Sequence, residues 1–254
     1  MTTNTIQPVP VIELTEVTRE FQIGTYVVRA LDGISLTIDQ GEMVAIIGPS
    51  GSGKSTLMNT LGCLDQPSSG SFVLNGQDVS GLSDDQLAET RSRQLGFVFQ
   101  SYNLLPRETA LSNVELPLKY SGGYSGKDRR AAARTALDRV GLSERYDHRP
   151  MQMSGGEQQR VGIARALVKN PELILADEPT GNLDTKSSSE VIKMLRSLNE
   201  VDGKTIVVVT HDPEVAEAMK RVIAFRDGRI VEDRIVTDRD TPITDLNVSS
   251  ETSE

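Results

Sequence analysis

The sequence predicts an α/β fold with a mainly parallel sheet, an N-terminal antiparallel β subdomain and an inserted helical subdomain. Two short runs, residues 43–47 and 173–176, are apolar throughout, and a third, 205–209, is apolar after Thr205. Such runs are typical of central parallel strands that are buried on both faces. Predicted strands also alternate with predicted helices along the chain, which favours a parallel sheet.

The N-terminal part of the chain shows the period of half-buried strands. Residues 11–17 and 31–38 alternate apolar and polar side chains, as strands with one solvated face do. The apolar run 43–47 then leads into a glycine-rich loop, and residues 54–61 follow as a predicted helix that ends at Gly62.

The central part adds further strands and a long helical stretch. Residues 71–74 and 95–99 are predicted strands, and residues 84–92 a predicted helix. From about 101 to 170 the pattern is helical, for example over 128–140, where apolar residues recur at helical spacing.

Two features close the chain. Residues 222–225 and 230–231 flank the turn Asp227-Gly228 and predict a hairpin. From about residue 238 the sequence is acidic and rich in Thr and Ser, which predicts a disordered tail over 238–254. We therefore expect one domain over 11–237, with its helical subdomain at about 101–170.

Composition excludes several functional classes. The 254 residues carry 36 acids against 27 bases, a formal net charge of −9. Binding to nucleic acid needs a basic surface, so we expect no nucleic-acid partner. The single cysteine, Cys63, permits no intrachain disulfide. The N-terminus lacks the order of a secretory signal. No apolar run approaches the ~20 residues that span a bilayer. If the protein acts at a membrane, we therefore expect it to do so without entering the lipid.

The glycine-rich loop matches a phosphate-binding pattern in full. It follows a predicted strand and opens a predicted helix, which is the context that the pattern requires. Glycines let backbone amides surround phosphate oxygens, and the start of the helix adds positive charge. Lys54 can reach the terminal phosphates of a nucleotide, and the Ser55 hydroxyl can ligate Mg²⁺. The loop comprises Gly48, Pro49, Ser50, Gly51, Ser52, Gly53, Lys54, Ser55 and Thr56.

Two carboxylates follow the buried strand 173–176. Asp177 and Glu178 lie at its carboxyl end, where α/β sheets place their ligands. Asp177 is the better candidate for holding Mg²⁺, and Glu178 can polarise a water that attacks the phosphate. An Asp-Glu pair after a strand is more often only a turn or a helix cap, but the phosphate loop upstream favours the functional interpretation.

Further motifs complete a family pattern. The segment 154–158, Ser-Gly-Gly-Glu-Gln, opens a predicted helix, Gln100 follows a strand, Asp184 closely follows Glu178, and His211 ends a strand. In this order and spacing the chain resembles the ATP-binding subunit of ABC transporters over nearly its whole length.

The resemblance has a subgroup. It runs from about residue 11 to 232, and the segments 62–65, 176–184 and 207–211 are most similar to the LolD/MacB group. That group is associated with lipoprotein release, macrolide and peptide export, and division-linked complexes. It implies a P-loop NTPase core that hydrolyses ATP with Mg²⁺.

The resemblance also implies a role for each matching residue. Glu178 is the implied general base, His211 the switch histidine that holds the γ-phosphate, and Asp184 the aspartate of the loop that follows. Gln100 senses Mg²⁺ and water, so that the implied metal set is Ser55, Gln100 and Asp177. The implied catalytic set is Glu178, His211, Lys54 and Gln100. The implied ATP-binding set adds to the phosphate loop the residues Phe21, Ser154, Gly155, Gly156, Glu157 and Asp184.

Three positions depart from the family pattern or leave it open. Phe21 is the best match for the aromatic residue that stacks on adenine, with Tyr26 as the alternative. The signature segment has Met153 where Leu is usual and Glu157 where Gln is usual. A carboxylate aimed at phosphates would repel them, but Ser154 and Glu157 also fit a capping box, which would turn Glu157 onto its own helix.

The resemblance implies two partners. In this family two copies pair head to tail, so that the loop at Lys54 of one copy faces Ser154 of the other across ATP. A membrane-spanning permease subunit would hold the protein at the cytoplasmic face of the cell membrane, as a peripheral subunit. Its helix would dock in a groove between residues 100 and 118. The apolar residues expected to form this groove are Leu104, Leu105, Val114, Leu116, Pro117 and Leu118.

Two alternative functions have weaker support. A soluble ABC ATPase that acts on DNA or ribosomes usually carries a coiled coil, a second ATPase copy or a basic surface, and the sequence has none of these. A scaffold without hydrolysis is disfavoured by the presence of Lys54, Glu178 and His211. The sequence does not identify the cargo, which the membrane subunit selects in this family.

Overall fold

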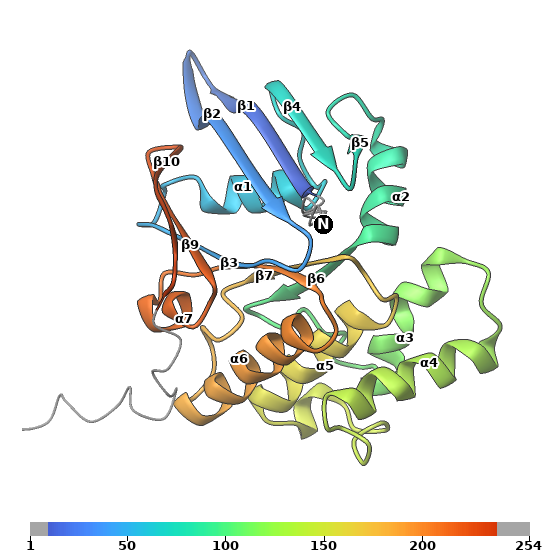
Figure 1. Ribbon diagram of the computed structural model, residues 1–254. Helices are drawn as coiled ribbons and strands as arrows, with labels where there is room; N and C mark the ends of the chain where they lie inside the picture. Colours follow the sequence, from blue (N-terminus) through green and yellow to red (C-terminus); the bar gives the residue numbers. More distant parts are fainter. Residues whose placement is uncertain (1–9, 238–254) are drawn as a thin grey trace, which may run out of the picture.

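The computed structural model describes residues 10–237, which form two stacked sheets with helices between and beneath them (Figure 1). Residues 1–9 and the predicted tail 238–254 lie outside the described residues. Between residues 10 and 237, no helix is long and apolar enough to cross a membrane.

The first sheet is the predicted antiparallel β subdomain. Its four strands run in the order β2-β1-β4-β5, and each neighbouring pair is antiparallel. Strands β1 and β2 continue beyond their predicted ends into a long hairpin whose outer half is largely exposed. The bounds are Pro10–Ile23 for β1, Tyr26–Asp39 for β2, Ser69–Leu74 for β4 and Gln77–Asp78 for β5.

The second sheet is mainly parallel, as predicted. Its order is β10-β9-β3-β8-β7-β6, and only β10 runs antiparallel to its neighbour. The predicted terminal hairpin is therefore β9 and β10. The bounds are Met43–Ile47 for β3, Leu95–Phe99 for β6, Leu173–Asp177 for β7, Thr205–Val209 for β8, Arg221–Arg226 for β9 and Arg229–Ile235 for β10.

Helices complete the layers (Figure 1). Two helices, α6 and α7, were not predicted, although the buried Val191, Ile192, Leu195 and Leu198 of α6 recur at helical spacing. The helices are α1 (Lys54–Leu61), α2 (Asp84–Gln94), α3 (Ala110–Ser121), α4 (Gly126–Arg139), α5 (Gly155–Leu167), α6 (Thr185–Glu200) and α7 (Pro213–Glu217), with a short 3-10 turn at Pro150–Gln152.

Two buried clusters hold the layers together. One lies between the two sheets and includes Leu57 and Leu61 of α1. The other lies on the opposite face of the parallel sheet, where helices α3, α4, α5 and α6 pack. Val114 of α3 and Leu137 of α4 belong to the same cluster as Ala176 of β7. The helical segment thus shares the core of the parallel sheet. That it forms a subdomain with boundaries at about residues 101 and 170 remains a prediction.

The expected docking groove is smaller than the sequence suggested. Val114 and Leu118 are fully buried in the core, and Leu104 packs against it. Because α3 turns Val114 and Leu118 inward, these two side chains present no surface to a partner. Leu105 is the most exposed residue of the predicted set, at 43%, while Leu116 and Pro117 are partly exposed.

Candidate functional site

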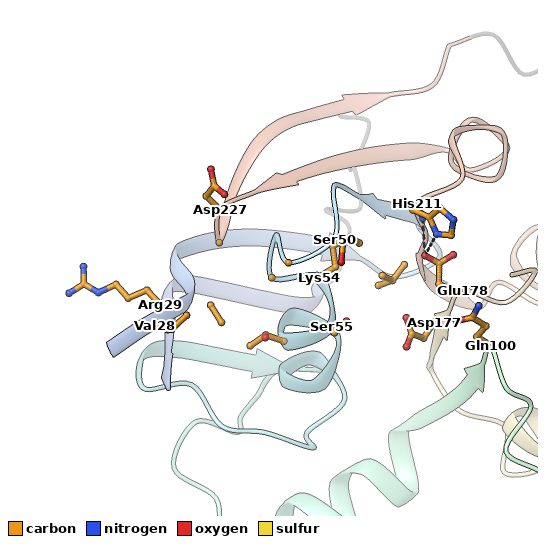
Figure 2. A pocket seen from close by; sticks show the side chains of 16 residues that line it. Val28, Arg29, Ser50, Lys54, Ser55, Gln100, Asp177, Glu178, His211 and Asp227 are labelled. Carbon is orange, nitrogen blue, oxygen red and sulfur yellow. Dashed lines mark hydrogen bonds and ion pairs between the residues drawn. The ribbon is translucent and has the colours of Figure 1, made fainter. Parts of the chain in front are cut away.

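A cavity of about 640 Å³ opens at the carboxyl end of the parallel sheet (Figure 2). Three separate regions that the sequence predicted to be functional line it: the phosphate loop, the ends of β6 and β7, and the segment after β8. The lining residues are Val28, Arg29, Ala30, Ser50, Gly51, Gly53, Lys54, Ser55, Thr56, Gln100, Asp177, Glu178, Val209, His211, Asp227 and Gly228.

Close backbone contacts explain two glycines of the phosphate loop. At Gly48, with φ +155°, a Cβ atom would lie 2.2 Å from the Phe225 carbonyl oxygen. At Gly53, with φ +107°, it would lie 2.4 Å from the Ala30 carbonyl oxygen. Any side chain at either position would displace backbone, so strands β9 and β2 hold the loop tightly against the sheets.

Lys54 begins α1 and closes the phosphate loop on itself. Its Nζ donates hydrogen bonds to the carbonyl oxygens of Gly48, at 2.7 Å, and Pro49, at 2.8 Å. The ammonium therefore lies against the phosphate loop, beside the positive end of the helix. This arrangement suits a phosphate, which needs several N–H donors and a positive charge.

Glu178 is held by the segment after β8 (Figure 2). Its Oε1 accepts from the backbone N–H of His211 at 2.9 Å and lies 2.7 Å from the His211 Nδ1. Its Oε2 accepts from the Thr210 hydroxyl at 3.0 Å. The residue has φ +45°, an uncommon backbone conformation for a non-glycine residue. Both carboxylate oxygens are thus oriented by neighbours, as a general base requires.

Asp177 lies beside Glu178 at the end of β7. Burial raises the pKa of the Asp177 carboxyl, the nearby Glu178 charge raises it further, and Lys54 partly opposes both. A half-buried carboxylate next to a second one is costly unless a cation joins them. The electrostatics of the site therefore favour a cation at this position.

Gln100 follows β6 and faces the same cavity (Figure 2). The backbone carbonyl oxygen of Gln100 accepts a hydrogen bond from the Asn182 side chain at 3.0 Å. The side-chain amide nitrogen of Gln100 packs against Gly181, where a Cβ atom would lie only 2.6 Å from it. Gln100 is thus linked to the loop that joins Glu178 to Asp184.

The signature segment forms the start of α5 and does not line the cavity. Ser154 caps the helix, and the capping box with Glu157 is present. The Glu157 carboxylate accepts from the Ser154 N–H at 2.8 Å and from Arg145 Nε at 2.9 Å. The Ser154 backbone bond, followed by the Arg145 bond, lowers the pKa of Glu157. Glu157 is therefore occupied by local contacts, as the capping-box interpretation predicted.

Asp184 lies at the start of α6, also outside the cavity lining. It caps the helix by accepting from the backbone N–H and the hydroxyl of Ser187, at 2.9 and 2.8 Å. The backbone bond, then the hydroxyl bond, lowers the pKa of Asp184. Ser187 also touches the signature segment, because a Cβ on Gly156 would lie 2.8 Å from its hydroxyl oxygen. The two segments form one continuous surface.

The two candidate stacking residues occupy different places on the β1–β2 hairpin. Phe21 pairs with Val28, which lines the cavity, whereas Tyr26 pairs with Ile23 at the tip. Directly paired residues on antiparallel strands share a face of the sheet, so Phe21 lies beside the cavity edge. Tyr26 is 76% exposed. Phe21 remains the better candidate, on position alone.

Several lining residues were not anticipated. Strand β2 contributes Val28, Arg29 and Ala30, and the turn between β9 and β10 contributes Asp227 and Gly228. The Gly228 N–H donates to the Ser52 carbonyl oxygen at 2.8 Å, so that this turn supports the phosphate loop. Sequence alone had identified the turn as a hairpin signal, but its contact across about 175 positions of chain appears only on folding.

Comparison with known proteins agrees with this geometry. The ABC transporter family profile matches residues 31–181. The macrolide export ATP-binding/permease protein MacB of Marinobacter nauticus is 56% identical over 228 residues, which cover 90% of this chain and 35% of that protein. The chain thus spans about a third of the length of the MacB relatives that it matches.

A second relative matches along its own whole length. An ABC transporter ATP-binding protein of Thermotoga maritima is 54% identical over 220 residues, which cover 87% of this chain and 93% of that protein. Among solved structures, the dimeric ATP-binding cassette MJ0796 bound to ADP and Pi superposes with a TM-score of 0.81 at 46% identity. That superposition covers 89% of this chain and 98% of the other.

Proposed function

The chain belongs to the ABC transporter family of ATP-binding proteins, and we propose that it binds ATP with Mg²⁺ and hydrolyses it for a separate membrane-spanning subunit of the LolD/MacB type. One observation carries the proposal. Glu178, oriented by His211 and Thr210, faces a cavity whose opposite wall is the phosphate loop with Lys54. A base and a phosphate cradle on opposite sides of one cavity suit attack by water on a terminal phosphate.

The residues of the cavity divide the work of hydrolysis. The amides of the phosphate loop and Lys54 bind the phosphates and stabilise the negative charge that develops on them. Glu178 takes a proton from the attacking water, and the His211 side chain, beside its Oε1, is placed to steady both Glu178 and the γ-phosphate. Phe21, at the edge of the cavity, is the proposed stacking surface for adenine.

The donor set fits Mg²⁺. Ser55, Gln100 and Asp177 line the cavity and offer a hydroxyl, an amide oxygen and a carboxylate, the oxygen ligands that Mg²⁺ prefers. Among residues 10–237 no group of three or more His, Cys, Asp or Glu gathers as a metal cage. That is the pattern of an ion bound together with substrate phosphates. The ion would neutralise charge that develops on those phosphates.

A second copy of the chain would complete the site. Ser154, Gly155 and Gly156 lie outside the cavity lining, so they act on a nucleotide only from another molecule. The MJ0796 cassette, which this chain resembles over most of its length, is dimeric. Glu157 is turned to Arg145 and its own helix, which keeps its charge away from a partner's phosphates. We therefore propose a head-to-tail pair of ATP-binding subunits.

The membrane subunit is the remaining partner. The MacB relatives carry both ATP-binding and permease in their names, and we propose that here a permease docks beside Gln100 and places the protein at the cytoplasmic face of the membrane. Leu105 is the exposed apolar contact. Its backbone N–H and carbonyl are held by the buried Asn113 side chain, at 2.7 and 3.2 Å, so the loop is a firm docking point.

The test of hydrolysis is Mg²⁺-dependent phosphate release from ATP by the purified chain. Turnover per molecule should rise with protein concentration, because the site is shared by two copies. Lys54→Ala should abolish turnover. Release that proceeds without Mg²⁺, or at equal specific rate at all concentrations, would contradict the metal site or the paired site respectively.

The test of coupling is the effect of a reconstituted membrane-spanning permease subunit on that rate. It should stimulate the wild type but not Leu105→Asp, which would bury an unpaired carboxylate at the contact. The matched control is Val201→Asp, at an 80% exposed residue on the far end of α6. Equal stimulation of all three proteins would exclude Leu105 from the contact. Absence of any stimulation would favour a soluble ATPase.

A further inference from the structure

We propose that Arg19, held by Asp65, is a positioning residue that presents the Phe21 ring to the nucleotide base. The inference rests on the proposed function, because it assigns a neighbour to the residue proposed to stack on adenine. Arg19 and Asp65 lie outside the lining of the nucleotide cavity. Asp65 ends the segment 62–65, which supports the subgroup resemblance, but the resemblance assigns no role to Asp65 or to Arg19.

The first observation is the contact between Arg19 and Phe21. They stand two residues apart on β1, so their side chains share a face of the strand. The Arg19 guanidinium carbon lies 4.7 Å from the centroid of the Phe21 ring. A guanidinium at this distance is attracted to the ring face. It therefore covers that face and restricts the rotation of the ring.

The second observation is the anchor of the guanidinium. Arg19 Nε donates to Asp65 Oδ2 at 2.9 Å, and a terminal nitrogen lies 2.5 Å from Oδ1. Two parallel bonds hold the planar group in one orientation, which a single bond would not. Both side chains are partly buried, at 24% and 25% exposure, so the pair is less screened by solvent than a fully exposed ion pair.

The third observation is where the anchor sits. Asp65 follows the end of α1, and its backbone N–H bonds to the Asn59 carbonyl oxygen at 3.2 Å. The first residues of the same helix are Lys54 and Ser55, in the phosphate loop. One rigid helix thus carries the phosphate cradle at its start and, through Asp65 and Arg19, orients the ring from its end.

The surroundings of the ring show why it needs this support. Phe21 is 36% exposed on a hairpin where Ile23, Tyr26 and Val27 are each more than half exposed, so no packed core holds it from the outer side. With Arg19 over one face, the surface that remains open is the one on which a base can stack. The support should therefore affect binding of the base and not binding of the phosphates.

The experiment compares two probes, Mg·ATP and Mg·tripolyphosphate, which has no base. We expect Arg19→Gln and Asp65→Asn each to weaken ATP binding about three- to tenfold, and to leave tripolyphosphate binding within about twofold. Arg19→Lys keeps the charge but loses the two-pronged bond, and should fall between. The control, Arg93→Gln, breaks an exposed ion pair with Glu89 on α2 and should change neither constant.

A double-mutant cycle separates positioning from structure. Phe21→Ala should weaken ATP but not tripolyphosphate, and adding Arg19→Gln to it should weaken ATP no further. Additive losses, or equal loss for both probes, would overturn the inference. If Phe21→Ala itself spares ATP, both the stacking role and the inference fail. If wild type binds neither probe, the proposed function fails. If Arg19→Gln does not fold, Asp65→Asn and Arg19→Lys test the inference through the same comparison of ATP affinity with tripolyphosphate affinity.

Discussion

Glu178→Gln tests which group takes the proton of the attacking water. The substitution keeps the size of the side chain. The new amide oxygen can accept from the His211 N–H, and the amide nitrogen can donate to the Thr210 hydroxyl, because a hydroxyl accepts as well as donates. The site should keep its shape and its affinity for Mg·ATP, and lose only the base.

The size of the effect follows from the role. A positioned base contributes about 10²- to 10⁴-fold to a rate, so the activation free energy should rise by about 3 to 5 kcal/mol. Glu178→Ala should behave differently, because it also removes the three contacts to His211 and Thr210. At roughly 1 kcal/mol net per hydrogen bond, that variant should lose up to about 3 kcal/mol of stability, whereas Glu178→Gln should lose little.

The assay measures phosphate release at saturating Mg·ATP, together with ATP affinity by calorimetry and the melting temperature. The control is Glu172→Gln, an exposed acid at the opposite end of β7, which should match wild type in all three. If Glu178→Gln binds ATP normally and keeps more than about a tenth of the wild-type rate, the base is another residue. Loss of ATP binding would instead make Glu178 a structural part of the pocket.

Three further predictions concern the rest of the site. Ser154→Arg should abolish turnover but leave ATP affinity of the isolated chain unchanged, and equal loss of both would refute the shared site. Gly53→Ala should lower the melting temperature well beyond Gly51→Ala: both have positive φ, but a Cβ at Gly53 would meet the Ala30 carbonyl at 2.4 Å, while Gly51 has nothing within 4 Å. Without metal, Asp177→Asn should raise the melting temperature at neutral pH. The folded protein raises the pKa of Asp177, so this carboxyl contributes its full stability below the unfolded-state pKa of 3.8, and the contribution declines as pH rises through the folded-state pKa. Parallel profiles of melting temperature against pH for the two proteins would contradict this.

Much of the site could be predicted because its motifs are local. The phosphate loop needs a strand, glycines, Lys54 and a helix in unbroken succession, and this order can be recognised directly in the sequence. The capping box of Ser154 and Glu157 lies within four consecutive residues and is present in the structure, as predicted. Asp177 and Glu178 follow a run of apolar residues that only a buried parallel strand explains.

Contacts between residues that are far apart in the sequence could not be predicted. Whether Val114 and Leu118 line a groove depends on which face of α3 meets the sheet, and the fold buries both. The contact of Gly228 with the phosphate loop joins segments that periodicity treats as unrelated.

The sequence by itself therefore determined the family and the main strands of the parallel sheet, because local spacing and residue type are enough for each. It did not predict α6 and α7, and the roles of the reacting groups remain predictions. The tertiary structure alone decided how these groups are oriented. His211 and Thr210 hold Glu178 from another strand, and Asp65 holds Arg19 over Phe21 from the far end of α1. Orientation needs contacts from several directions, and only the folded chain brings residues so far apart in sequence within bonding distance.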